Sequence, residues 1–252
     1  MEPGTRRLRL IGVGPGDPRL LTVAAVEAIG ATDVFFVLEK RDEVADLTAF
    51  RTDLLDRYAR APYRVVNLPD PDRDRAAADY GAAVQDWQQR RTDRLVEAIA
   101  AALAPGETGA LLVWGDPSLY DGSLRMAGEL AARAPWPLRI DAIPGVSSLH
   151  LLTARHRIPL NRIGAAVRLT TGRRLPETPP DAATDVVVFL DSQGALAEID
   201  PDGIDIYWGA YLGTPDEMLL AGPLAEVRAE ILRRRAEART RKGWLFDVYL
   251  LR

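Results

Sequence analysis

Short apolar runs alternate with longer amphipathic stretches through residues 1–143. An apolar run bounded by glycine, proline or polar turn residues is typical of a buried strand, and apolar residues recurring every three or four positions indicate a helix. The pattern predicts strands at 8–13, 33–38, 64–68, 110–114 and 138–143, and helices at 20–29, within 39–60, within 75–103 and at 118–132. Strict alternation of strand and helix predicts an α/β domain with a mostly parallel sheet and helices on both faces.

The remaining residues are richer in strands, with hairpin-like spacing near the end. We expect helices at 146–154 and 224–239, a loop at 173–180, and strands at 165–170, 186–190, 205–210, 218–221 and 244–251. We therefore predict two domains, an N-terminal α/β domain of residues 1–144 and a C-terminal mixed α/β domain of residues 145–252.

The composition is that of a soluble globular protein, with 252 residues, 47% hydrophobic and 27% charged. The 32 basic and 36 acidic residues give a net charge of −4, which argues against general nucleic-acid binding. The chain has no cysteine and two histidines, so disulfides and thiolate metal sites are excluded and no metal is expected. Without a signal pattern or a long apolar run, we expect a cytoplasmic protein with no membrane partner.

Arginine supplies nearly all of the positive charge, since Lys40 and Lys242 are the only lysines. This bias is typical of a GC-rich genome, but arginine is also the side chain that pairs best with carboxylates. Composition alone leaves both explanations open. We interpret the run Arg233–Arg235 as the solvated face of a helix.

The first chemical motif is Gly12–Asp17 (GVGPGD), which directly follows a predicted strand. Glycines at a strand end let a ligand approach the backbone closely, as in dinucleotide-binding folds. However, Asp17 occupies the third glycine position of that fingerprint, and Pro15 lacks the N–H that a phosphate would bind. The motif therefore favours a neutral or cationic ligand, and a purely structural turn stays possible.

Two further motifs follow predicted strands, Trp114–Tyr120 (WGDPSLY) and Pro144–Ser148 (PGVSS). Ligands of open parallel sheets bind outside the carboxyl ends of strands, so these loops point to one shared site. Ser118 is a candidate helix N-cap, as is Ser147 or Ser148. The third motif lacks the second glycine of a Gly-x-Ser-x-Gly nucleophile elbow.

Together the Gly-x-Gly-Pro-Gly-Asp start with its following Leu-Leu-Thr, the Gly-Asp-Pro-x-x-Tyr segment and Pro-Gly-Val-Ser-Ser resemble the tetrapyrrole methylase family. The chain looks like one of its cobalamin (vitamin B12) pathway methyltransferases. The resemblance implies two α/β domains with S-adenosyl-L-methionine in the cleft between them, S-adenosyl-L-homocysteine as product, and a homodimer. It further implies methylation of carbon 1 of precorrin-5, a tetrapyrrole, with release of acetate.

The resemblance also implies site residues. Acetate release benefits from a base and a donor to the developing oxyanion, and the candidates are Asp17, Tyr120 and Asp121. Their alternative roles are turn formation, capping and packing. The candidates for binding the methyl donor are Pro15, Gly115, Asp116, Pro117, Ser118, Ser147, Ser148, Thr171, Tyr207, Gly209, Ala210 and Leu220. The candidates for pairing with substrate carboxylates are Arg125, Arg155 and Arg173, together with Arg157 and Arg174.

Three alternatives stay open. The chain could methylate another precorrin or related tetrapyrrole. It could be an NAD(P)-dependent oxidoreductase that uses the first glycine loop, although Pro15 and Asp17 count against this. It could also bind tetrapyrroles without catalysing a reaction.

Overall fold

The computed structural model describes residues 4–39, 45–72, 79–177, 179–181, 183–192 and 194–252. The chain divides into two compact units. The first comprises Met1–Gly14 and Pro18–Gly145, and the second comprises Pro15–Asp17 and Val146–Arg252. Of the helices in the described ranges, none combines the length and apolar character that crossing a membrane requires.

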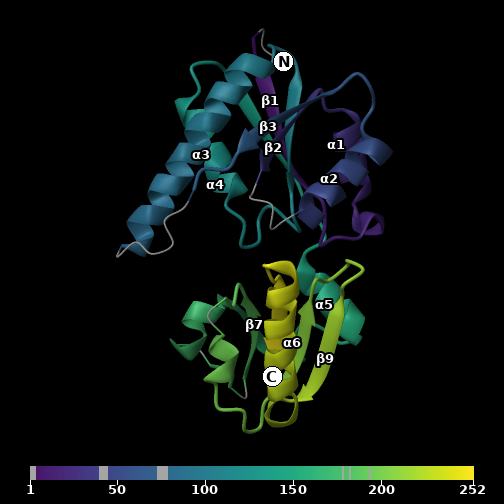
Figure 1. Ribbon diagram of the computed structural model, residues 1–252, viewed down its shortest axis with the longest axis vertical. Helices are drawn as coiled ribbons and strands as arrows, with labels where there is room; N and C mark the ends of the chain where they lie inside the picture. The colour runs from purple at the N-terminus through teal and green to yellow at the C-terminus, as the bar shows by residue number, and fades with distance from the viewer. Residues whose placement is uncertain (1–3, 40–44, 73–78, 178, 182, 193) are drawn as a thin grey trace. The chain divides into compact units, whose positions relative to one another are not determined.

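A five-stranded sheet forms the centre of the first unit, and all of its strand pairs are parallel (Figure 1). Its spatial order is β3-β2-β4-β1-β5. The strands are β1 (Arg6–Gly12), β2 (Val34–Glu39), β3 (Arg64–Pro69), β4 (Thr108–Val113) and β5 (Leu138–Ile143). Every residue of β4 is buried, as expected of a central strand covered on both faces, whereas the edge strand β3 is largely exposed. The predicted parallel sheet is confirmed.

Two helices cover each face of this sheet (Figure 1). On one face α1 (Val23–Gly30) and α2 (Ala45–Tyr58) pack through Ile29 and Leu54 against Phe35 of β2. On the other face α3 (Tyr80–Ala102) and α4 (Ser123–Arg133) pack against β1 and β4. The helices expected within 39–60 and 75–103 are observed, although residues 40–44 and 73–78 lie outside the described ranges.

The helix predicted at 118–132 instead begins at Ser123, and its N-cap is Gly122, so the assignment of Ser118 as N-cap is wrong. Two aspartates hold turns before the helix, because Asp116 and Asp121 each accept a hydrogen bond from the backbone N–H two residues later. Between them Tyr120 has a left-handed φ of 50°, which a right-handed helix cannot contain.

The second unit contains a mixed sheet of order β6-β7-β10-β8-β9. Its strands are β6 (Ala166–Thr171), β7 (Thr184–Phe189), β8 (Asp205–Ala210), β9 (Met218–Pro223) and β10 (Asp247–Leu251). The predicted hairpin is confirmed in the antiparallel pair β8 and β9. The last strand inserts between β7 and β8 and begins at Asp247, three residues later than expected. The prediction of a loop at 173–180 is wrong in part, since a 3₁₀ helix, η3, spans Gly172–Glu177.

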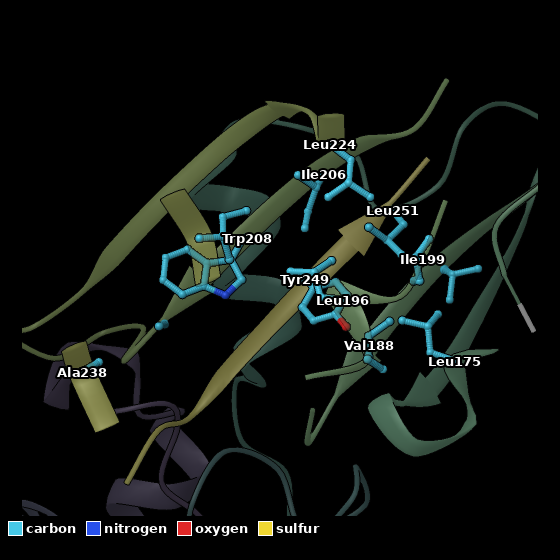
Figure 2. Close-up of a cluster of buried hydrophobic side chains, with 14 of the residues drawn as sticks. Leu175, Val188, Leu196, Ile199, Ile206, Trp208, Leu224, Ala238, Tyr249 and Leu251 are labelled. Atoms are coloured by element: carbon cyan, nitrogen blue, oxygen red, sulfur yellow. The ribbon is translucent and has the colours of Figure 1, made fainter. Parts of the chain in front are cut away.

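The core of the second unit lies between one face of this sheet and α6 (Leu224–Lys242). Figure 2 shows Trp208 and Tyr249 in this core, with Leu224 and Ala238 of α6 nearby. On the opposite face α5 (Ser148–His156) packs so closely that a Cβ atom at Gly209 would lie 2.8 Å from Leu152 Cδ1. A side chain at Gly209 would therefore require the Leu152 side chain to shift.

A buried polar network fixes α6 to the sheet. Arg235 is 2% exposed, and its guanidinium lies 2.9 Å from Asp191 Oδ2 and 3.0 Å from Asp247 Oδ2. Tyr249 donates its hydroxyl hydrogen to Asp191 at 3.0 Å, and the Trp208 indole N–H donates to Asp247 at 2.9 Å. The two carboxylates therefore share one buried cation, which compensates their desolvation.

The expectation of a solvated Arg233–Arg235 face is wrong for Arg235. Arg233 fits it, because its side chain is 54% exposed and pairs with Glu230 and Glu237 on the same helix. The physical reason is helical geometry: residues two apart on a helix point about 200° apart, so one faces water and the other faces the sheet.

The pKa values of the two carboxyl groups in this network shift in opposite directions. Burial raises the pKa of Asp191, but the Arg235 charge and hydrogen bonds from the Ala195 N–H and the Tyr249 hydroxyl outweigh it, so the pKa lies below its ordinary value. Burial raises the pKa of Asp247 above its ordinary value despite the opposing charge of Arg235.

Candidate active site

The parallel sheet has a topological switch point between β1 and β4. These strands are neighbours, yet the chain continues from β1 to α1 on one face and from β4 to α4 on the other. Ligands of open α/β sheets bind outside the strand ends at such a point. We call residues 13–22, 114–122 and 144–147, which follow β1, β4 and β5, the strand-end loops.

A two-residue bridge joins the first two strand-end loops. The Gly14 N–H donates to the Gly115 carbonyl at 3.2 Å, and the Gly115 N–H donates to the Gly14 carbonyl at 2.8 Å. Both residues have left-handed backbones, with φ of 76° and 72°. A Cβ atom added at Gly115 would meet no other described residue within 4 Å. The backbone of Gly115 therefore leaves room for close approach by a ligand.

Two other glycines, Gly12 and Gly145, allow neighbouring backbone segments to pack closely. A Cβ atom at Gly145 would lie 2.2 Å from the Gly115 carbonyl oxygen, and one at Gly12 would lie 2.6 Å from the Gly145 nitrogen. The ends of β1, β4 and β5 thus touch backbone to backbone. The missing side chain of Gly12 thus makes room for the backbone of Gly145.

Asp116 ties two strand-end loops together. Its Oδ2 accepts the Gly145 N–H at 2.9 Å, while its Oδ1 accepts the Ser118 N–H at 2.8 Å and the Ser118 hydroxyl. Thr22, the N-cap of α1, donates its hydroxyl hydrogen to the Pro144 carbonyl at 3.3 Å. These bonds hold all three strand-end loops in one arrangement.

The three residues predicted to assist acetate release are divided between the two units. Tyr120 and Asp121 belong to the loop after β4, whereas Asp17 groups with the second unit, where a Cβ atom at Gly213 would lie 3.2 Å from its nitrogen. Tyr120 is 42% exposed, and partial burial raises its pKa, so its phenol stays protonated at neutral pH. Asp121 accepts the Ser123 N–H at 2.6 Å.

Ser147 is the N-cap of α5, and Ser148 is the first residue of that helix. The buried Ser147 Oγ accepts the His150 N–H at 3.4 Å and lies 2.8 Å from His150 Nδ1. Sequence reasoning missed this side-chain pair. The available signal was the three-residue spacing from an N-cap serine to a polar third helical residue, as in a capping box.

The other donor-binding candidates of the second unit are strand residues. Leu220 packs against the core beneath α6, and Ala210 is fully buried in it. Thr171 ends β6, and the Tyr207 ring packs edge-on against His156 at 5.6 Å. Pro15 and Pro117 are buried, whereas Ser118 is exposed.

The candidate arginines differ in their present partners. Arg155 Nε lies 2.7 Å from Glu217 Oε1, and Glu217 also accepts the Gly213 N–H. Arg125 lies on α4, with its Nη1 3.5 Å from Gln88 Oε1. Arg173 is an exposed residue of η3.

Comparisons with known proteins identify the family of the chain. The model of the tetrapyrrole (corrin/porphyrin) methylases matches residues 7–228, and the chain belongs to this family. It is 41% identical over 252 residues to the precorrin-6A synthase [deacetylating] of Sinorhizobium sp, covering 100% of this chain and 97% of the relative. It is 32% identical over 184 residues to the precorrin-2 C(20)-methyltransferase of the same organism, covering 69% of this chain and 71% of that protein.

A solved structure extends the likeness to the fold. The putative cobalamin synthesis related protein (CobF) from Corynebacterium diphtheriae superposes with a TM-score of 0.83 at 32% identity, and the match covers 98% of each chain. The predicted fold class of two α/β domains, one with a parallel and one with a mixed sheet, is thereby confirmed.

Proposed function

We propose that the chain is an S-adenosyl-L-methionine-dependent C-methyltransferase of cobalamin biosynthesis, which methylates carbon 1 of precorrin-5 and releases acetate to give precorrin-6A. The observation that carries this specific reaction is the 41% identity to a deacetylating precorrin-6A synthase over the whole chain. Family membership counts against the nicotinamide-dependent alternative.

The strand-end loops fit a sulfonium donor better than a dinucleotide. Gly115 offers a backbone with room beside it, and Asp116 places a carboxylate in the same loop. A carboxylate stabilises a nearby cation and repels a pyrophosphate. We therefore assign donor binding to Gly115–Ser118 in the first unit. In the second unit, the assignment from the sequence covers Pro15, Ser147, Ser148, Thr171, Tyr207, Gly209, Ala210 and Leu220.

Methyl transfer is an in-line displacement in which the positive charge of the donor is neutralised, so its rate depends mainly on alignment and exclusion of water. Hydrogen bonds between the strand-end loops fix their backbone before the donor binds, and this rigid backbone can align the methyl group with its acceptor carbon. Bound S-adenosylmethionine supplies the methyl group, and S-adenosylhomocysteine is the product.

The substrate side chains are carboxylates, for which guanidinium groups are suitable partners. We propose Arg125 and Arg173 as partners of these carboxylates. Arg155 joins them only by exchanging its bond with Glu217 for one with the substrate. Asp17, Tyr120 and Asp121 remain the sequence-based candidates for proton transfer in acetate release.

Three expectations from the sequence are part of the proposal. They are a homodimer, a cytoplasmic location, and functional domains of residues 1–144 and 145–252. Light scattering of the purified protein measures the first directly.

The test is a single-turnover reaction of the purified protein with S-adenosylmethionine and precorrin-5, followed by product mass and free acetate. We expect the product to gain one methyl group and lose one acetyl group. Precorrin-2 is the comparison substrate, because the chain also resembles a precorrin-2 methyltransferase. Methylation of precorrin-2 together with inert precorrin-5 would contradict the proposed substrate while preserving the methyltransferase class.

A further inference from the structure

An arginine interrupts the apolar face by which α2 packs on the parallel sheet. Leu47 and Leu54 of this face are buried, and Phe50 is partly buried against the same core. Arg51 lies four positions after Leu47 and three before Leu54, so its side chain leaves the helix on the same side and is half-buried. Such a position normally carries an apolar residue, and a charge there is a local conflict of the kind found at functional sites.

No carboxylate neutralises Arg51 among the residues that the structure describes. Within those residues its guanidinium makes no hydrogen bond or ion pair, and the charge that acts on it is that of Arg91. Burial and the positive charge of Arg91 both lower the pKa of Arg51 from its ordinary value. Arg91 is already engaged, since its Nε lies 2.9 Å from Asp70 Oδ1 and its guanidinium lies 4.5 Å from the centroid of the Trp87 ring. Arg51 therefore keeps its hydrogen-bond donors for a further anion.

Contacts within the first unit locate Arg51 near the carboxyl ends of the parallel strands. Its neighbour Phe50 packs edge-on against Trp114 with 5.2 Å between ring centroids, and Trp114 directly follows β4. Asp70, the partner of Arg91, directly follows β3. Because α2 and α3 cover opposite faces of the sheet, Arg51 and Arg91 can face each other only where the sheet ends. Ligands of open α/β sheets bind outside the carboxyl ends of the strands.

We propose that Arg51 binds a carboxylate group of a ligand at the carboxyl end of the sheet of the first unit, with Arg91 adding to the attraction. The guanidinium fork matches a carboxylate with two parallel hydrogen bonds. A bound carboxylate would also offset the repulsion between the two arginines. Under the proposed function, on which this inference rests, two ligands carry such groups: the tetrapyrrole through its acetate and propionate side chains, and the methyl donor through its amino-acid carboxylate.

The test measures, by calorimetry, the binding of one probe for each source of the carboxylate. Uroporphyrin III is a stable tetrapyrrole with acetate and propionate side chains, and S-adenosylhomocysteine keeps the carboxylate of the donor. Loss of a hydrogen bond between charged groups weakens binding about 10- to 100-fold, so we expect Arg51→Gln to raise the dissociation constant of at least one probe by about this factor. Arg51→Lys keeps the charge without the fork, so its effect should be smaller than that of R51Q.

Arg57→Gln is the matched control. It removes the same charge from the last turn of α2, where Arg57 Nε lies 2.8 Å from Asp53 Oδ1 on the helix surface. We expect R57Q to bind both probes as tightly as the unaltered protein does.

Two further measurements distinguish ligand binding from a structural role. R51Q should have an unfolding free energy in urea equal to or above that of the unaltered protein, because it removes a half-buried charge that faces another cation. In single-turnover reactions with precorrin-5, a role in binding the tetrapyrrole should raise the half-saturating concentration in parallel with the dissociation constant of uroporphyrin, and the maximal rate should stay within about threefold.

The outcomes separate this inference from the proposed function. Weaker binding of uroporphyrin by R51Q than by R57Q identifies the tetrapyrrole as the source of the carboxylate, and weaker binding of S-adenosylhomocysteine identifies the donor; either result supports the inference. Equal binding of both probes by the two variants would overturn it, as would an unaltered protein that binds neither probe. The proposed function fails instead if the unaltered protein binds the probes but leaves precorrin-5 unmethylated.

Discussion

Replacing Asp116 by asparagine should loosen the strand-end loops and weaken donor binding together. The carboxylate serves the Gly145 N–H with one oxygen and the Ser118 N–H with the other. An asparagine has a single oxygen, so in either orientation its amide N–H₂ faces a backbone N–H and one of the two donors loses its acceptor.

The size of the effect follows from these contacts. A hydrogen bond to a charged group contributes about 1.5–3 kcal/mol, and the half-buried position of Asp116 lets water compensate part of the loss. We therefore expect the free energy of unfolding to fall by about 1.5–2 kcal/mol in D116N. Because the bond to Gly145 joins two loops, we also expect the dissociation constant of S-adenosylhomocysteine to rise by about tenfold, or about 1.4 kcal/mol.

The assays are urea unfolding and isothermal calorimetry. Asp181→Asn is the matched control, since Asp181 also accepts a backbone N–H two residues on, from Ala183, but lies in the second unit and joins no strand-end loop. Weaker donor binding with unchanged stability would refute the positioning role and indicate direct contact between carboxylate and donor. Lower stability with unchanged donor binding would refute the assignment of the donor to these loops.

Three further predictions concern the fold. Gly145→Ala should cost about 1–3 kcal/mol of unfolding free energy because its Cβ meets the Gly115 carbonyl, whereas Gly128→Ala on exposed α4 surface should be neutral or stabilising, as urea unfolding would show. Arg235→Ala leaves two buried carboxylates without their cation and should cost about 3–5 kcal/mol, whereas Arg233→Ala should leave the unfolding free energy nearly unchanged; similar values for both would contradict the buried network. The pKa of Asp191 in the folded protein lies below its ordinary value of 3.8. The ionised carboxylate therefore stabilises the fold fully above pH 3.8, and this stabilisation is lost as the pH falls through the pKa of the folded state. The difference in unfolding free energy between the unaltered protein and D191N should shrink as the solution is acidified in this range.

Local patterns in the sequence were enough to predict the parallel α/β class of the first unit and the three loops that follow its strands. Apolar runs such as 110–114 are local signals, and a strand buried on both faces needs apolar residues at every position. The three glycine-containing motifs were recognisable because glycine, proline and aspartate restrict the backbone locally. The N-cap at Ser147 was likewise predictable, since capping involves residues only a few positions apart.

Only the folded chain shows which of these residues lie in contact with one another. Strand order places β4 beside β1, which makes the switch point and explains Gly12 through its contact with Gly145. The Arg235 side chain pairs with Asp191, 44 residues away in the sequence, although the preceding Arg233 and Arg234 favoured the prediction of a solvated face. Such contacts join residues far apart in the chain, and their energies come from desolvation and close packing, which leave no periodic trace in a sequence.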